Sequence, residues 1–137
     1  MGKIIAIDFG KKRIGLAITD SEKIIASPLK TVDRKEIFSF LKHLFLTEDI
    51  ECIVLGDPKK KNNKNNELIK YLMKFHNKIK SEFHVPVHFI DERFTSKIAF
   101  RIILDANIKK MKRRDKSLVD KVSASLILET YLKKTKK

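Results

Sequence analysis

The amino-acid sequence predicts an α/β fold in which a mixed five-stranded sheet carries helices on both faces. In the second half of the chain, short apolar runs rich in β-branched residues alternate with amphipathic helical patterns. In the first 27 residues, three strand-like segments follow one another very closely. Only antiparallel connections can join them, because a parallel crossover needs a dozen or more residues.

Each predicted strand corresponds to one apolar run. In chain order, the runs are residues 4–7, 13–19, 23–27, 52–55 and 87–90. The first three are expected to form an antiparallel meander, and the last two to pair in parallel. Cys52, the only cysteine, begins the fourth run and is expected to pack as a small hydrophobe, which excludes a disulfide framework.

Amphipathic helices are predicted between and after the later strands. Four segments repeat apolar residues at helical spacing, namely residues 34–46, 66–80, 95–107 and 118–132. Asp33 with Glu36 resembles a capping box at the start of the first helix. Thr95 or Ser96 can cap the third. The basic tail over residues 133–137 is expected to be disordered.

Length and charge narrow the class of protein. A chain of 137 residues favours one domain that spans residues 1–137. Its 31 Lys and Arg residues outnumber 17 Asp and Glu residues, and the formal net charge is +14. Such an excess is expected for a nucleic-acid binder or a protein of acidic membrane surfaces, although A/T-rich codons could also raise the lysine content.

Two strongly basic segments, residues 59–66 and 109–116, lack apolar periodicity and are expected to be exposed loops. We expect their cations to contact phosphates, and these cations are Lys59, Lys60, Lys61, Lys112, Arg113 and Arg114. The chain begins with a strand-like run and lacks a secretory signal or an apolar run of membrane-spanning length. The sequence therefore predicts a cytoplasmic protein that binds nucleic acid and no membrane.

Acidic residues follow several predicted strands. Asp8 ends the first run, Asp57 follows the fourth, and Asp91 with Glu92 follows the fifth. In open α/β sheets, ligands bind at the carboxyl ends of the strands, so these acids would gather at one edge if the strands are parallel neighbours. Asp57 precedes a proline and fits a turn residue better. Asp120 lies in the last helix on a face that also carries small residues.

Carboxylates gathered in this way would repel one another unless a divalent cation holds them. Oxygen ligands favour Mg²⁺ or Mn²⁺. Such a site can activate water and stabilise the leaving oxygen of a phosphodiester. Hydrolysis of nucleic acid is therefore the predicted chemistry.

Each acid also has a structural interpretation. Asp8 could close a turn with the amide of Gly10. Asp91 and Glu92 could pair with the arginine that follows them or cap the next helix. Asp120 ends the capping-box pattern "SLVD", so spacing alone leaves its structural and catalytic roles open.

Four segments carry a resemblance to a known family: "IDFGKKRIGLAITD", "IVLGDP", "DERFTSKIA" and "VDKVSASLILETYL". In this order, spanning nearly the whole chain, they resemble the YqgF family, also called RuvX, of RNase H-like nucleases. The family is described both as nucleases that process the 5′ end of pre-16S rRNA and as Holliday junction resolvases that act on branched DNA. The resemblance implies an RNase H-like fold and a metal-dependent nuclease.

The resemblance also implies roles for particular residues. It assigns catalytic and metal-binding roles to Asp8, Glu92 and Asp120, with Asp91 as a substitute for Glu92 or a helper beside it. Residues implied to face nucleic acid or to organise the acids are Lys11, Lys12, Arg13, Arg93, Thr95 and Ser96. The chain departs from the family at Asp57, where relatives have an apolar residue, and in the glycine-free segment that follows.

Two rival functions stay open at this point. A phosphotransferase of the actin and sugar-kinase type also has an acid and a glycine in its first hairpin, but it needs two such domains. A non-catalytic RNA-binding factor in ribosome assembly would explain the charge equally well. A symmetric junction cutter would act as a homodimer, whereas an end-processing enzyme could be a monomer.

Overall fold

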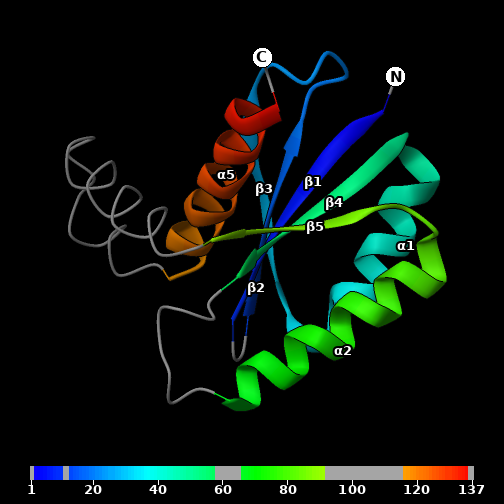
Figure 1. The fold of residues 1–137 in the computed structure, drawn as a ribbon, viewed down its shortest axis with the longest axis vertical. Helices are drawn as coiled ribbons and strands as arrows, with labels where there is room; N and C mark the ends of the chain where they lie inside the picture. Colours follow the sequence, from blue (N-terminus) through cyan, green and yellow to red (C-terminus); the bar gives the residue numbers. More distant parts are fainter. Residues whose placement is uncertain (1, 11–12, 58–65, 92–115, 136–137) are drawn as a thin grey trace.

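The computed structural model describes residues 2–10, 13–57, 66–91 and 116–135. A five-stranded sheet lies between α1 and α2 on one face and α5 on the other (Figure 1). The strands are β1 (Lys3–Phe9), β2 (Arg13–Thr19), β3 (Ala26–Asp33), β4 (Ile50–Asp57) and β5 (Val87–Asp91). The helices are η1 (Arg34–Glu36, a short 3₁₀ turn), α1 (Ile37–Thr47), α2 (Asn66–Phe83) and α5 (Lys116–Thr135). The predicted α/β class, with helices on both faces, is confirmed.

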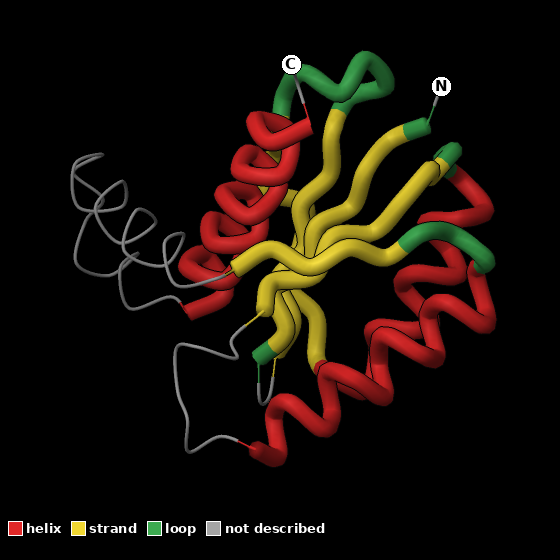
Figure 2. The backbone as a smooth tube through the Cα atoms, viewed as in Figure 1, coloured by secondary structure: helices red, strands yellow, loops and turns green. Residues whose placement is uncertain are grey.

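The strand order is β3-β2-β1-β4-β5, which Figure 2 shows as one continuous twisted sheet. β1 pairs antiparallel with β2, and β2 pairs antiparallel with β3. β4 lies parallel to both β1 and β5. The carboxyl ends of β1, β4 and β5 therefore lie at the same edge, as the sequence predicted. Within the described segments, none of the helices has the length and apolarity needed to cross a bilayer.

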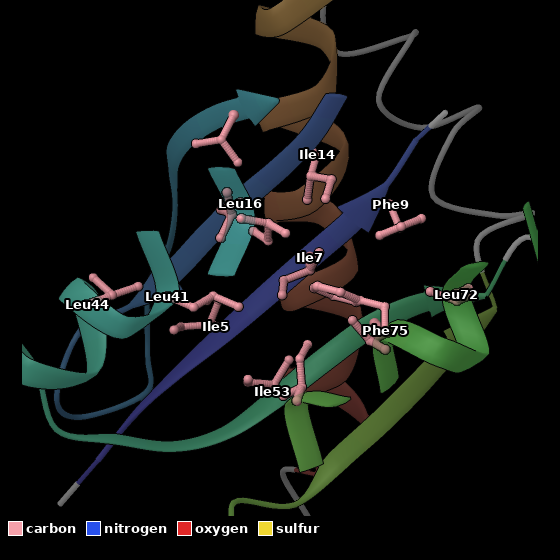
Figure 3. Close-up of a cluster of buried hydrophobic side chains, with 14 of the residues drawn as sticks. Ile5, Ile7, Phe9, Ile14, Leu16, Leu41, Leu44, Ile53, Leu72 and Phe75 are labelled. Atoms are coloured by element: carbon pink, nitrogen blue, oxygen red, sulfur yellow. The ribbon is translucent and has the colours of Figure 1, made fainter. Parts of the chain in front are cut away.

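Side chains of β1 alternate between two apolar cores. Ile5, Ile7 and Phe9 pack with residues of α1 and α2. Ile4 and Ala6 pack with residues of α5. Figure 3 shows the first core, where side chains from β1, β2, β4, α1 and α2 meet. Burial on both faces explains why the runs that form β1 and β4 are almost continuously apolar.

The third strand begins later than the sequence predicted, because residues 20–25 form a turn. Asp20 Oδ1 accepts hydrogen bonds from the amides of Ile24 at 2.8 Å and Ile25 at 2.9 Å. Lys23 has a φ of 60°, which a strand cannot contain. The bonds from the Ile25 and Ile24 amides hold the pKa of Asp20 below its usual value. The side chains of Ile24 and Ile25 are exposed to solvent, and neither residue belongs to a strand.

Three of the four predicted helices are present with altered ends. The capping box at Asp33 is wrong, because this residue pairs with Arg13 in the sheet and makes no side-chain cap. α2 extends past its predicted end to Phe83, and His84 closes it with a φ of 56°. α5 includes residues 133–135, which the sequence assigned to a disordered tail. The helix predicted over residues 95–107 lies outside the described residues.

Cys52 packs as predicted, in the core beneath α5. Burial raises the pKa of its thiol, so a reactive thiolate is disfavoured at neutral pH. Tyr131 of α5 lies beside this thiol and opposes part of the rise in its pKa. Burial raises the pKa of Tyr131 as well. This contact, with the stacking of Tyr131 on His88 at 5.5 Å between ring centroids, fixes the carboxyl end of α5 near the starts of β4 and β5.

Thr19 stabilises the start of β1. Its buried Oγ1 accepts a hydrogen bond of 2.9 Å from the Ile4 amide, at a point where the pairing of β1 with β4 is irregular. Thr19→Val should therefore lower the free energy of unfolding by roughly 1–3 kcal/mol, because it leaves a buried amide without an acceptor. Denaturant titration would measure this. Thr135→Val, at an exposed hydroxyl, should change stability by less than about 0.5 kcal/mol; equal effects of both changes would contradict the assignment.

Candidate functional site

Asp8 lies at the carboxyl end of β1, one residue before the strand ends, and its side chain is partly exposed. By the alternation of side chains it shares a face with Ile4 and Ala6, which pack against α5. Phe9, the next residue, belongs to the opposite core. The only acid within β1 therefore faces α5 at the edge where β4 and β5 also end.

Glycines flank Asp8 on both neighbouring strands. Gly15 of β2 is its direct partner in the antiparallel pair. On the other side, Ile7 is level with Leu55 of β4, so Asp8 is level with Gly56. Neither neighbour has a side chain that could cover the carboxylate. A glycine inside a strand weakens the strand and often marks the close approach of a ligand or another backbone.

The amino-terminal end of α5 reaches the same edge. α5 runs opposite to β1 and β4 (Figure 1), and its Tyr131 is fixed beside Cys52 near the start of β4. Asp120 lies eleven residues before Tyr131, or about 16 Å along a helix. Asp57 lies five residues after Cys52, also about 16 Å along a strand. The backbone of Asp120 is therefore level with the strand ends.

Small residues line this face of the sheet and of the helix. Ala6 and Ala17 of the sheet and Ala124 of α5 are fully buried together. Ser123, the neighbour of Ala124, is also buried. Side chains this short let α5 approach β1 and β2 closely, as predicted from the face that they share with Asp120.

The acids at the ends of β4 and β5 lie beside each other on paired strands. Asp57 and Asp91 are partners in the parallel pair. The backbones of two predicted site acids, Asp8 and Asp120, therefore lie at the edge where Asp91 ends β5 and where Asp57, expected to be a turn residue, ends β4. Glu92 lies outside the described residues. Among the described side chains, no group of three or more His, Cys, Asp or Glu residues could hold a metal ion.

The turn after Asp8 is held by backbone and side-chain contacts. The amide of Gly10, which could have closed an Asx turn with Asp8, donates to the Arg13 carbonyl at 3.0 Å. A Cβ on Gly10 would lie 2.6 Å from that carbonyl oxygen, so only glycine fits without a shift. Arg34 Nη2 donates to the Gly10 carbonyl at 2.9 Å.

The remaining predicted nucleic-acid contacts are only partly visible. Arg13 begins β2 with an intermediate exposure, next to the turn that follows Asp8. The others lie outside the described residues: Lys11, Lys12, Lys59, Lys60, Lys61, Arg93, Thr95, Ser96, Lys112, Arg113 and Arg114. Their proposed roles therefore rest on the sequence.

The glycines beside Asp8 were missed from the sequence. Gly15 and Gly56 each interrupt an apolar strand pattern, and such an interruption can indicate close approach to a backbone or ligand. Their relation to Asp8 depends on the register of three strands, which local sequence does not encode. Only the sheet brings these residues together.

Comparison with known proteins decides the family. Residues 2–134 match the RuvX family, which is described as Holliday junction resolvase. This chain belongs to the RuvX family. The RuvX chain resembles a protein of Porphyromonas gingivalis at 48% identity and one of Bacteroides thetaiotaomicron at 43% identity, each over 96% of both chains. Both relatives carry the name "Putative pre-16S rRNA nuclease".

Solved structures support the same fold. T. thermophilus RuvC in complex with a Holliday junction substrate aligns with a TM-score of 0.62 and 16% identity, covering 98% of the RuvX chain and 97% of its own. The Fowlpox virus resolvase with Holliday junction DNA gives a TM-score of 0.58 at 14% identity, covering 98% and 99%. The RuvX chain has the RNase H-like fold of these resolvases. Its family membership makes it a nuclease, a hydrolase of phosphodiester bonds.

Proposed function

We propose that this RuvX chain is a divalent-metal-dependent nuclease that processes the 5′ end of pre-16S rRNA in the cytoplasm, as a step of ribosome biogenesis. The names of relatives at 48% and 43% identity support this substrate. The structural observation that carries the chemistry is the position of Asp8. It faces α5 between two strand glycines, at the edge where Asp57 and Asp91 are also paired.

Asp8, Glu92 and Asp120 are the proposed metal ligands and catalytic acids, with Asp91 as a helper. Carboxylate oxygens are the ligands that Mg²⁺ and Mn²⁺ prefer, and the glycines paired with Asp8 on both sides place no side chain beside it. When bound, such an ion would activate water and stabilise the leaving oxygen of a phosphodiester. The carboxylates of Asp8, Glu92 and Asp120 would hold that ion at the sheet edge.

The alternation of side chains along β5 supports Glu92 over Asp91 as the ligand from the end of this strand. His88 stacks on Tyr131 of α5, and Ile90 belongs to the core beneath α5. Residues two apart in a strand face the same side of a sheet, and in the sequence Glu92 is two positions after Ile90. Asp8 shares that side.

The basic residues are proposed to hold the phosphate backbone. Arg13 stands beside the turn after Asp8, and the remaining basic candidates are Arg93 and the residues of the segments 11–12, 59–61 and 112–114. Contacts to phosphate position a nucleic acid without reading its sequence. A net charge of +14 supports this role.

Junction resolution is the second candidate function, because the family is described as Holliday junction resolvase. A junction cutter would act as a symmetric homodimer, since it must cut two strands related by two-fold symmetry. A monomer would suffice for end processing. The oligomeric state and the preferred substrate together therefore distinguish the two candidate functions.

The testing experiment compares cleavage of matched substrates in Mg²⁺, Mn²⁺ and EDTA. The panel contains a 16S rRNA precursor leader, single-stranded RNA, single-stranded DNA and a four-way DNA junction. Fastest cleavage of the precursor leader would support the proposed function. Fastest cleavage of the four-way junction would instead favour Holliday junction resolution. Binding without cutting in every metal would instead favour the non-catalytic assembly factor.

A further inference from the structure

A pocket of about 160 Å³ opens beneath η1, between α1 and α2. It lies on the face of the sheet opposite Asp8, because Phe9 forms part of its wall. Cavities of about 150 Å³ accept a single aromatic ring, whereas drug-sized ligands need roughly 300 Å³ or more. The side chains that give the pocket its character are Phe9, Arg34, Phe38, Tyr71, Lys74 and Lys78.

Cations lie over aromatic rings around this pocket. The Arg34 guanidinium is 4.4 Å from the Tyr71 ring centroid and 5.1 Å from that of Phe9. Lys78 Nζ is 4.1 Å from the centroid of Phe38. Among the described lining residues none is acidic. Together these features favour a planar ligand that also carries negative charge.

Arg34 links this pocket to the edge that carries Asp8. Its Nη2 donates to the carbonyl of Gly10, in the turn two residues after Asp8. Its Nε is buried and has no hydrogen-bond acceptor among the residues that the structure describes. A buried donor without an acceptor is costly, and a small shift of the Arg34 side chain toward a polar atom of a ligand would remove that cost.

We infer that this pocket binds one unpaired nucleotide of the substrate strand, with the base against Tyr71 and Arg34 and the phosphate beside Lys74 and Lys78. The inference rests on the proposed function, which supplies the nucleic acid. Unpaired bases stack on aromatic rings and guanidinium planes, and their edges accept hydrogen bonds. A base within a duplex is stacked and paired and cannot enter. The pocket would therefore select substrates with a single-stranded segment beside the cut site.

The test measures binding of short labelled single-stranded RNA in EDTA by fluorescence anisotropy. Tyr71→Ala should weaken binding by about five- to a hundredfold, the usual range for losing one stacked base. Met73→Ala, which also removes an exposed apolar side chain from α2, is the matched control and should bind like wild type. Lys78→Ala should likewise weaken binding more than Lys80→Ala, which removes the same charge from an exposed position on that helix.

An abasic series gives a second readout. Each RNA of this series lacks the base at one position. Wild type and Tyr71→Ala should bind one of these RNAs equally tightly, because the base that would stack on Tyr71 is missing from it. Melting temperatures of all variants establish that they fold. Equal RNA binding by Tyr71→Ala and Met73→Ala would overturn the inference. So would free AMP or UMP binding as tightly as the oligonucleotide, which would make this a mononucleotide site.

Failure of this inference and failure of the proposed function give different results. If wild type cuts RNA and Tyr71→Ala binds and cuts like Met73→Ala, the pocket assignment fails and the nuclease stands. If wild type cuts nothing in Mg²⁺ or Mn²⁺ while Tyr71→Ala still loses RNA binding, the nuclease fails. The pocket then stands as a site for unpaired nucleotides.

Discussion

Asp8→Asn should abolish metal-dependent cleavage while leaving the fold intact. The substitution keeps the size of the side chain but removes the charge that would hold the cation. Loss of an outer-shell partner of a metal typically costs ten- to a hundredfold in activity, so loss of a proposed ligand should cost more than about a hundredfold. Cleavage rates on the best substrate of the panel, in Mg²⁺ and Mn²⁺, measure this effect.

Asp8→Asn should have little effect on the melting temperature without metal, and it should remove the stabilisation that bound metal gives. In EDTA, the melting temperature should shift by less than about 5 °C, because Asp8 is partly exposed at the end of its strand. Added Mn²⁺ should raise the melting temperature of wild type, since a ligand bound to the native state stabilises it, and should not raise that of the variant.

Asp49→Asn is the matched control for Asp8→Asn. It makes the same chemical change at an exposed residue just before β4, at the opposite edge of the sheet. This control should retain full cleavage and the Mn²⁺-dependent rise in melting temperature. Cleavage by Asp8→Asn at the rate of the control would remove the proposed site.

Glu92→Gln should reduce cleavage far more than Asp91→Asn. The expected loss is more than about a hundredfold for Glu92→Gln and about ten- to a hundredfold for Asp91→Asn, since an outer-shell helper contributes less than a ligand. The reason is the alternation of β5, in which His88 and Ile90 meet α5 and Phe89 stacks on His76 of α2. Parallel rate measurements on the two variants check it.

The pair of variants is its own control, because each removes one negative charge from adjacent positions. A larger loss in Asp91→Asn would reverse the assignment and make Asp91 the ligand. Equal losses of more than a hundredfold would mean that both carboxylates hold the metal. Unchanged cleavage in both would remove the end of β5 from the catalytic site.

Local pattern was sufficient to predict most of the architecture and the position of Asp8. Continuous apolar runs indicated strands buried on both faces, and a carboxylate directly after the first run indicated a site at the strand end. Helical spacing put Ala124 and Ile127 on the buried face of α5, where the structure has them. These predictions succeed because side-chain period and burial are properties of a short segment.

Local pattern failed where a side chain competed with the backbone. The segment "KIIAS" has strand composition, yet Asp20 takes the amides of Ile24 and Ile25 and holds them in a turn. Asp33 has the pattern of a helix cap, yet the ladder between β2 and β3 holds it in the sheet. At both Asp20 and Asp33 the sequence allowed more than one arrangement, and only the structure shows which one forms.

The sequence by itself determined the strands β1, β2, β4 and β5, the helices α1, α2 and α5, which faces are apolar and which acid lies near the end of the first strand. Only the tertiary structure decided what lies beside that acid. Gly15 and Gly56 flank Asp8 through the registers of two different strand pairs, and the Arg34 pocket joins residues of β1, η1, α1 and α2. Registers and pockets arise from contacts between distant segments, whose energies depend on the packing of the whole core. No short stretch of sequence contains that information.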